Sequence, residues 1–289
     1  MEAPLVVIVG PTASGKSGLA MKLAEQFGGE IICADSRTVY KGMDIGTAKP
    51  TAEDQARVPH WGLDLVEPNE PFSVADFQKY AYEKIADIRA RGKVPFLVGG
   101  SGLYIDAVIF EFQFGPVDRE FRKTLDKLSL EELREYCFEN NIILPENEKN
   151  RRHLITAIER KNVVSKGLTE PQRNSCIVGI TTEKDILLKR IHERSEHLFD
   201  SGMLEEAITL GTKFGWKSEA MTGNIYKLVK EFVDGNITKN ELKQRFEISD
   251  WQLAKRQLTW LKRNPFITWL ELDYAEKYIA RRLAETLAA

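Results

Sequence analysis

The residues best suited to chemistry lie near the start of the chain, in the stretch Gly10-Pro11-Thr12-Ala13-Ser14-Gly15-Lys16-Ser17. This stretch has the spacing G-x-x-x-x-G-K-[ST], in which glycine-rich backbone and a helix N-terminus bind phosphate groups. Lys16 can add positive charge to such a site, and the Ser17 hydroxyl can bind Mg²⁺. The pattern predicts a phosphate-binding loop (P-loop). Its usual ligand is a nucleoside triphosphate, and any pyrophosphate ester would also fit.

The residues on either side supply the elements that position this loop. Residues 5–9 form a short apolar run rich in β-branched side chains, which predicts a buried strand. Residues 18–24 have apolar side chains at helical spacing. Strand, glycine-rich turn and helix together form the context in which the motif binds phosphate.

A second candidate group is Asp35, which directly follows a predicted strand at residues 30–34. Open α/β sheets gather their catalytic groups at the carboxyl ends of the strands, where the P-loop also lies. Asp35 is therefore expected beside the P-loop, either as a catalytic carboxylate or as a turn cap formed with Ser36. The loop that continues to residue 50 is long, and long ordered loops are often functional.

Strands and helices alternate along the first part of the chain. A helix is predicted at 73–91, a glycine-rich turn at 99–104, and further strands at 60–66, 94–98 and 174–180. This alternation predicts an α/β fold with a parallel, doubly wound sheet flanked by helices.

The alternation stops near residues 114–117. Residues 118–174 contain helix candidates at 119–128, 130–140 and 150–164 and no strand candidate, which predicts an inserted all-helical subdomain. Residues 1–117 and 175–289 then form the core domain. Its C-terminal part is predicted to be helical at 183–200, 203–212, 220–233, 239–246 and 250–263, with a terminal helix from Asp273.

Charge limits what the chain can bind. The net charge is −2, so a nucleic-acid partner would have to meet a local basic patch. Residues 149–166 hold six Lys and Arg and one Glu, and residues 239–264 hold seven Lys and Arg and three acidic residues, with Trp251 and Trp260 among them. Both stretches suit RNA, although solvated helix faces often have the same composition.

The cysteines and the N-terminus indicate the compartment. Cys33, Cys137 and Cys176 are widely spaced and odd in number, which matches neither a zinc pattern nor a disulfide framework. The sequence shows no signal peptide and no apolar run of membrane-spanning length. We therefore expect a cytoplasmic protein with reduced thiols and no membrane contact.

Several motifs, taken together and in order, resemble the tRNA dimethylallyltransferase family, the tRNA isopentenyltransferases. They are GPTASGKS at 10–17, Asp35-Ser36, Tyr40, MDIGTAKP at 43–50, His60, GGSGLY at 99–104 and AKRQLTW at 254–260. The resemblance extends from about residue 5 to residue 263, and it looks like the bacterial form because no C-terminal Cys/His finger is present.

The resemblance implies a reaction. A dimethylallyl group moves from dimethylallyl diphosphate to N6 of the adenosine just 3′ of the anticodon in tRNA, and diphosphate leaves. The implied fold is kinase-like, with a P-loop that holds the isoprenoid diphosphate and with Mg²⁺ as cofactor. The implied partners are dimethylallyl diphosphate and the anticodon arm of tRNA, which the insert at 118–174 would help to clasp. The chain is expected to act as a monomer.

The resemblance also implies roles for individual residues. Asp35 matches the family's general base, which orients the adenine amine and takes its proton. Lys16, Arg194, Thr12 and the rest of the P-loop match groups that bind the diphosphate and stabilise its developing charge, with Ser17 on Mg²⁺. The base must leave its stack to react. Positions that match tRNA contacts are Asp35, Ser36, Arg37, Thr38, Ser101, Arg122, Arg152, His153, Leu154, Ile155 and Thr156.

Three positions depart from the family's usual pattern. Thr38 stands where Gln is usual, Trp251 where Arg is usual, and Ile225 where Gly is usual. These changes leave the diphosphate site intact and suit a relative with altered tRNA preference.

Three other functions are open at this point. An adenylate isopentenyltransferase acting on AMP, ADP or ATP would share the P-loop and Asp35, but it would not need the helical insert. A small-molecule kinase would bind ATP in the P-loop. A non-catalytic RNA-binding relative would explain Thr38 and Trp251, although the full set of P-loop residues together with Arg194 argues against it.

Overall fold

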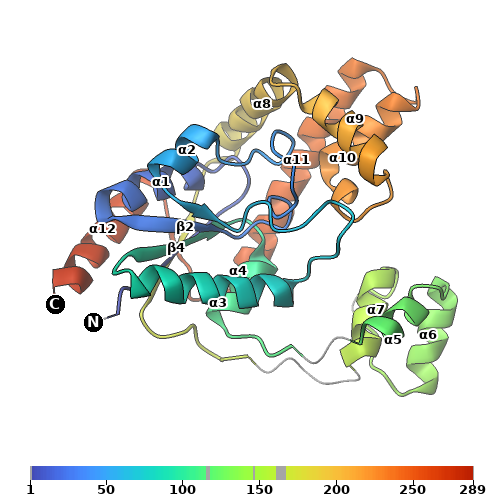
Figure 1. The fold of residues 1–289 in the computed structure, drawn as a ribbon, viewed down its shortest axis with the longest axis horizontal. Helices are drawn as coiled ribbons and strands as arrows, with labels where there is room; N and C mark the ends of the chain where they lie inside the picture. The colour runs from blue at the N-terminus through green and yellow to red at the C-terminus, as the bar shows by residue number, and fades with distance from the viewer. Residues whose placement is uncertain (1, 115–117, 146, 161–166, 289) are drawn as a thin grey trace. The chain divides into compact units, whose positions relative to one another are not determined.

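The computed structural model describes residues 2–114, 118–145, 147–160 and 167–288 (Figure 1). The chain divides into two compact units, one made of Met1–Phe110 and Glu170–Ala289 and the other of Glu111–Thr169. The second unit falls in the region of the predicted insert. The assignment of residues 118–174 to tRNA binding stays a prediction.

The first unit is built on a six-stranded sheet with the strand order β3-β2-β4-β1-β5-β6. All neighbouring strands pair in parallel, which confirms the predicted α/β fold. The strands are β1 (Leu5–Val9), β2 (Gly29–Cys33), β3 (His60–Trp61), β4 (Val94–Gly99), β5 (Ser175–Ile180) and β6 (Thr268–Leu270).

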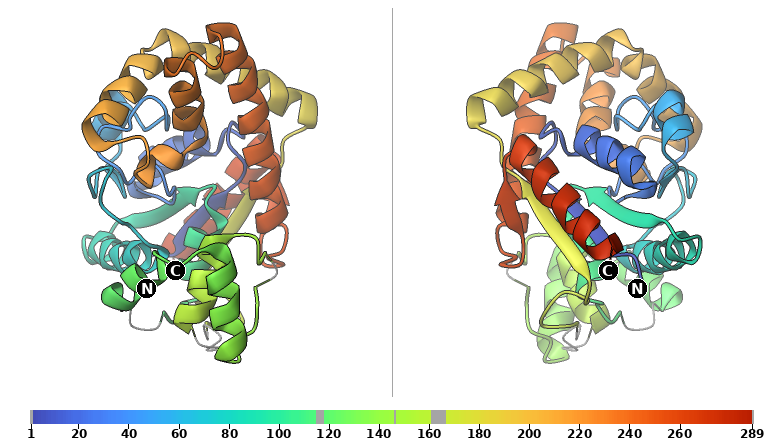
Figure 2. Two further views of the ribbon diagram at one scale, coloured as in Figure 1. Left: turned by 90° about the vertical axis from the view of Figure 1, so that its right-hand side faces the viewer. Right: turned by 90° about the vertical axis from the view of Figure 1, so that its left-hand side faces the viewer.

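Helices cover both faces of this sheet. On one face, Leu5, Val7 and Val9 of β1 pack with α3 (Val74–Ala90) and α4 (Gly102–Ile109). On the other face, Val6 and Ile8 pack with α1 (Lys16–Phe27) and α12 (Leu272–Ala288), and α12 lies along β5 (Figure 2). Because both faces are buried, β1 is apolar at every position instead of alternating.

A helical region of the same unit has its own core. It comprises α8 (Lys184–Asp200), α9 (Met203–Phe214), the short 3₁₀ helix η1 (Ala220–Thr222), α10 (Asn224–Val233) and α11 (Lys239–Leu261). Val39, Tyr40 and Met43, from the long loop after β2, are buried among these helices. The loop that follows Asp35 is therefore held by packing on a rigid scaffold.

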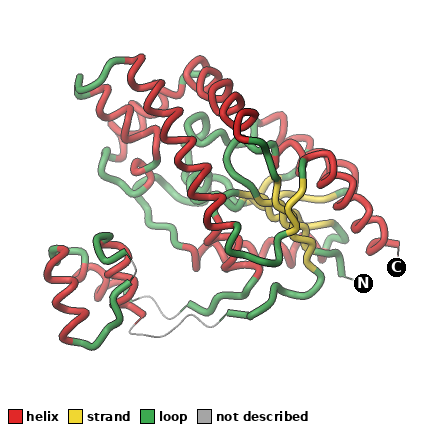
Figure 3. The backbone as a smooth tube through the Cα atoms, turned by 180° about the vertical axis from the view of Figure 1, so that it is seen from behind, coloured by secondary structure: helices red, strands yellow, loops and turns green. Residues whose placement is uncertain are grey.

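The second unit is helical in the part that the structure describes (Figure 3). Its helices are α5 (Arg119–Leu125), α6 (Leu130–Glu139) and α7 (Arg151–Arg160). Ser129 and Glu132 form a capping box that begins α6. Leu133, Cys137, Leu154 and Ile158 belong to a separate apolar core, so this unit buries its own hydrophobic faces.

Several boundaries differ from the sequence prediction. The strand predicted at 60–66 ends at Trp61, because Asp64 adopts a left-handed φ of 54° and Leu65 donates to the Val39 carbonyl, 2.7 Å away, instead of to a strand. The helices predicted at 239–246 and 250–263 are one helix, α11, since no glycine or proline interrupts 247–249. Helix α2 (Ala52–Arg57) and β6 were not predicted.

Glu30 of β2 supports a prediction about stability. Its side chain is 1% exposed, and its carboxylate accepts from Arg91, from Trp61 Nε1 at 2.8 Å and from Lys93 at 3.0 Å. These partners, Arg91 above all, lower the pKa of Glu30 to about 2. A depressed carboxyl pKa stabilises the fold above the unfolded value, near 4.5, and the stabilisation is lost as pH falls towards 2.

Replacing Glu30 with Gln should therefore lower the free energy of unfolding at pH 7 by about 2–3 kcal/mol. Chemical unfolding across pH 2 to 7 measures it. The difference between wild type and variant should shrink as pH falls below about 4.5. A difference that stays constant over this range would show that the charge of Glu30 does not stabilise the fold.

Candidate functional site

The P-loop joins the end of β1 to the start of α1, as the sequence predicts. Ala13 and Gly15 have positive φ values of 60° and 91°, which turn the backbone sharply before Lys16. Gly15 takes this conformation without the strain that a side chain would bring. The loop thereby ends at the N-terminus of α1, where unpaired N–H groups favour an anion.

Lys16 points back across the loop. Its Nζ donates to the Pro11 carbonyl at 3.1 Å. The pKa of Lys16 is lowered to about 8, chiefly by burial; the charge of Asp35 opposes this shift, and the charge of Arg194 adds a smaller lowering. Asp35 and Arg194 therefore act electrostatically on Lys16, although the three residues lie far apart in the sequence. The three predicted catalytic residues share one site.

Two arginines of α8 reach the P-loop from the side. Arg190 Nη1 donates to the Ser14 carbonyl at 3.1 Å, and Arg194 Nη1 donates to the Thr12 hydroxyl. Arg194 Nη1 also lies 3.1 Å from Asp250 Oδ2 of α11. Arg190 and Arg194, four residues apart on α8, thus both contact the phosphate-binding loop, and Arg194 also pairs with Asp250 of α11.

Asp35 sits at the end of β2 with one carboxylate oxygen held. Its Oδ1 accepts from the Arg37 backbone N–H at 2.8 Å, and among the described residues Oδ2 has no hydrogen-bond partner. The neighbouring Ser36 N–H donates to Ser101 Oγ at 3.1 Å, which ties this turn to the glycine-rich turn after β4. The hydrogen bond to Oδ1 fixes the carboxylate, and Oδ2 can accept a hydrogen bond from a ligand.

The inner face of α11 also contacts these loops. Gln257 Oε1 accepts from the Thr12 N–H at 2.8 Å. Trp260 donates from Nε1 to Asp106 at 2.7 Å, and its ring lies so close to Gly102 that a Cβ there would come within 2.0 Å of it. The roles of Gln257 and Trp260 were not predicted, although both lie in the AKRQLTW run, the signal that could have found them.

The residues around the P-loop suit a metal ion that takes most of its coordinating oxygens from a bound phosphate compound and from water. Within the described part of the chain, no group of three or more His, Cys, Asp or Glu side chains could hold a metal ion. Ser17 is exposed at the second position of α1, and no hydrogen bond of its hydroxyl is found among the described residues. Mg²⁺ typically binds one or two protein oxygens together with substrate phosphates and water, so Ser17 suits it.

Comparison with known proteins identifies the family. The IPP transferase family model matches residues 38–264, and the isopentenyl transferase model matches residues 3–59. A tRNA dimethylallyltransferase of Geobacillus thermodenitrificans is 37% identical and covers 97% of this chain and 94% of its own length. The chain belongs to the IPP transferase family. This confirms the resemblance found in the sequence.

Solved structures of IPP transferase family members agree with this fold. The tRNA isopentenylpyrophosphate transferase of Bacillus halodurans is 35% identical, with a TM-score of 0.76 over 99% of this chain and 97% of that one. A similar enzyme of Staphylococcus epidermidis is 32% identical, with a TM-score of 0.73 over 99% of both chains. Both matches cover 99% of this chain.

The structure gives partners to several residues that the IPP transferase resemblance placed at the tRNA surface. Arg37 donates to the Glu219 carbonyl at 3.0 Å and to the Ala220 carbonyl at 3.3 Å. Thr38 is buried, and its hydroxyl lies 3.4 Å from the Asp35 carbonyl. Both side chains are therefore engaged within the protein, where they support the turn that carries Asp35.

In the insert, the predicted tRNA contacts divide into two groups. Leu154 and Ile155 are buried in the core of this unit, and Arg122 pairs with Glu159 at 2.8 Å. His153 is exposed and Thr156 half-buried. The side chain of Arg152 lies outside the described part of the structure.

The basic cluster at 149–166 is only partly described, since residues 161–166 lie outside the described ranges. Arg151 donates from Nη2 to the Leu125 carbonyl at 3.0 Å and from Nη1 to the Leu128 carbonyl. Arg151 thus closes the C-terminal end of α5 and connects it to α7. Replacing Arg151 would therefore disturb the packing of this unit as well as any binding of RNA.

Glu206 of α9 is a further residue that the sequence did not single out. Its carboxylate accepts from the backbone N–H groups of Asp44, Ile45 and Gly46 at 2.7 to 2.9 Å, and from the Tyr226 hydroxyl at 3.0 Å. It therefore holds the MDIGTAKP loop of this IPP transferase on the helical region.

Replacing Glu206 with Gln should release this loop, because a neutral amide binds three N–H groups poorly. We expect the free energy of unfolding to fall by about 2–3 kcal/mol, and hydrogen exchange at residues 44–46 to become faster. Chemical unfolding and amide exchange measure the two effects. Glu205→Gln, on the exposed neighbour, is the matched control. Equal exchange in the two variants would show that Glu206 does not hold the loop.

Proposed function

We propose that this chain transfers the dimethylallyl group of dimethylallyl diphosphate to N6 of the adenosine 3′ of the anticodon in tRNA. The observation that carries the proposal is the meeting of Lys16, Arg194 and Asp35 at the P-loop. A positively charged cradle lies beside a carboxylate that is held by one oxygen only. Relatives that match over almost the whole chain are named as tRNA dimethylallyltransferases.

The cationic half of the site suits a diphosphate leaving group. Negative charge grows on the diphosphate as the bond from carbon to oxygen breaks, and positive groups fixed nearby stabilise that charge. Lys16 and Arg194 supply this charge, and the N-terminus of α1 supplies N–H dipoles. Mg²⁺ bound through Ser17 and the phosphate oxygens would neutralise part of the diphosphate charge.

The carboxylate half suits a weak amine nucleophile. The N6 lone pair of adenine is delocalised into the ring, so the amine gains reactivity when a carboxylate accepts its hydrogen bond and then its proton. Asp35 Oδ1 is occupied by Arg37 N–H, which leaves Oδ2 for N6. The acceptor base must be unstacked to enter, as in other enzymes that act on a single base.

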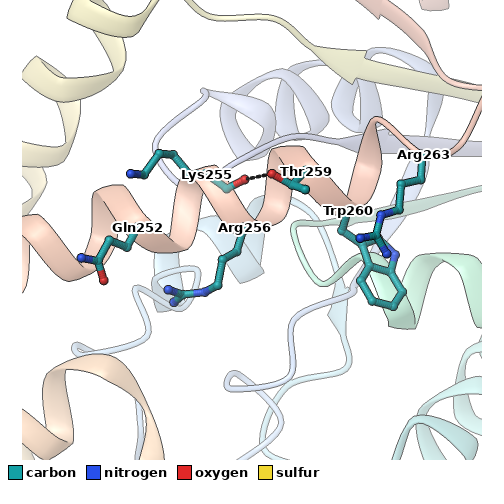
Figure 4. Close-up of a pocket in the computed structure, with 6 residues that line it drawn as sticks. All are labelled: Gln252, Lys255, Arg256, Thr259, Trp260 and Arg263. Carbon is teal, nitrogen blue, oxygen red and sulfur yellow. Dashed lines mark hydrogen bonds between the residues drawn. The ribbon is translucent and has the colours of Figure 1, made fainter. Parts of the chain in front are cut away.

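Helix α11 also offers a surface for the tRNA that carries this base (Figure 4). An open groove of about 670 Å³ runs along the helix. Its lining residues are Gln252, Lys255, Arg256, Thr259, Trp260 and Arg263. Within the described residues, no acidic side chain pairs with Lys255, Arg256 or Arg263, so their charges remain available to phosphates. A mononucleotide acceptor would need no such surface.

The test is a transfer assay with labelled dimethylallyl diphosphate. We expect label in unmodified tRNA and none in AMP, ADP or ATP. Label in the free nucleotides alone would favour an adenylate isopentenyltransferase. Phosphate transfer from ATP in place of prenyl transfer would favour a kinase. Binding of tRNA without transfer to any acceptor would favour a non-catalytic RNA-binding protein.

A further inference from the structure

The contact between α8 and α11 places two oppositely charged side chains next to the P-loop. Leu187 and Ile191 of α8 pack against Ala254 of α11, and Ala13 of the P-loop joins the same cluster. Arg194 lies one turn beyond Ile191, and Asp250 lies one turn before Ala254. The helix packing therefore sets where these two side chains meet.

Asp250 is buried, and among the described residues Arg194 is its one charged partner. Its side chain is 6% exposed, and its Oδ2 accepts a hydrogen bond from Arg194 Nη1 at 3.1 Å. Burial raises the pKa of Asp250, and the charge of Arg194 opposes that rise. A buried carboxylate is costly unless it is paired, so it constrains the position of its partner.

Arg194 in turn has hydrogen-bonding capacity left over. Its Nη1 donates to Asp250 and to the Thr12 hydroxyl, whereas its Nε is buried with no partner among the described residues. A guanidinium has five N–H donors and suits planar, bidentate binding of phosphate oxygens. The unused donors of Arg194 are thus held at the P-loop before any ligand arrives.

We propose that Asp250 is a positioning residue for the prenyl transfer. Asp250 fixes the side chain of Arg194 against Thr12, so that the guanidinium of Arg194 is already oriented when the diphosphate binds. This inference rests on the proposed function, because it assigns the ligand of that same site. A long arginine side chain otherwise loses rotamer freedom when it binds, and fixing it beforehand avoids that loss. Asp250 itself does not touch the reacting atoms.

The first measurement is steady-state kinetics of Asp250→Asn, which keeps the size of the side chain and removes its charge. We expect kcat/KM for dimethylallyl diphosphate to fall about 10-fold. The dissociation constant for tRNA without donor should stay unchanged. Glu196→Gln is the matched control, because Glu196 also joins α8 to α11, through Lys243 at 2.9 Å, and does not contact the P-loop. Its kinetics should match wild type.

The second measurement is a double-mutant cycle with Arg194→Ala. If Asp250 acts through Arg194, adding Asp250→Asn to Arg194→Ala should lower kcat/KM no further. A multiplied loss in the double variant would show that Asp250 acts independently of Arg194. Tighter donor binding by Asp250→Asn would show that Asp250 chiefly repels the diphosphate. Either result would overturn the positioning role.

A second variant covers the case in which Asp250→Asn is unstable, and the transfer assay of wild type separates the two proposals. If Asp250→Asn does not fold, Asp250→Ser replaces it, because a small side chain leaves room for water around the guanidinium; the cycle and its expected result are unchanged. Failure of wild type to transfer the prenyl group would contradict the proposed function. Transfer by wild type together with wild-type kinetics in the Asp250 variant would contradict only the role of Asp250.

Discussion

Replacing Asp35 with Asn should lower kcat for prenyl transfer by ~10²–10⁴-fold, the usual range for losing a general base. The amide keeps the shape of the side chain and can still accept from the Arg37 N–H, as Asp35 Oδ1 does at 2.8 Å. It cannot take a proton from N6. The binding of dimethylallyl diphosphate should stay nearly unchanged, because the carboxylate serves the acceptor amine.

Single-turnover kinetics with saturating tRNA measure this step, and a donor-binding isotherm measures the affinity. Asp87→Asn is a suitable control, since Asp87 lies on α3 and pairs with Arg91 outside the site. Turnover within a few-fold of wild type in Asp35→Asn would remove Asp35 from the mechanism. A large loss of donor affinity would instead place its carboxylate on the donor side, through its electrostatic effect on Lys16.

The sequence predicted the parts of the fold that local signals specify. The run at 5–9 is buried on both faces, and the capping box of Ser73 with Asp76 begins α3 where the helix was expected. The P-loop and Asp35 follow β1 and β2, and the prediction of a parallel sheet was sufficient to place them together, because parallel strands deliver their following loops to the same edge. Arg194 was assigned by the family resemblance, and it reaches the P-loop from α8 through Thr12.

The remaining features depend on contacts between distant residues. Nothing near Asp250 in the sequence indicates that Arg194, 56 residues away, will share its burial. Gln257 likewise acts on Thr12 across a separation of 245 residues. β6 has three residues and was missed because its strand character comes from pairing with β5. The helical signal of α7 was clear, but it could not show that Leu154 and Ile155 face the core of the insert.

One structural finding does not depend on the proposed activity. Within the described residues, no helix is both long and apolar enough to span a membrane. Cys33 is half-buried and Cys176 is buried, and desolvation raises the pKa of Cys33 to about 12 and that of Cys176 to about 11. Thiols with raised pKa values are mostly protonated at neutral pH, so Cys33 and Cys176 are poorly suited to act as nucleophiles.

Replacing Lys16 with Ala should lower kcat/KM for dimethylallyl diphosphate by about 10²–10³-fold and should also change its pH dependence. Protonated Lys16 is the form that attracts the diphosphate. Because burial lowers the pKa of Lys16 to about 8, the free protein loses this charge as pH rises through that value. In wild type, kcat/KM should therefore fall above pH 8.

Profiles of kcat/KM against pH from 6.5 to 9.5, in wild type and Lys16→Ala, separate this effect from ionisation of the substrates. The alkaline fall should be present in wild type and absent from the variant, since the ionisation of donor and tRNA is common to both. Lys22→Ala is the control, because Lys22 lies on the same helix but is exposed and pairs with Glu276 at 2.7 Å. It should retain the wild-type profile. The same alkaline fall in Lys16→Ala would assign the titration to another group and would leave Lys16 as a fixed charge at neutral pH.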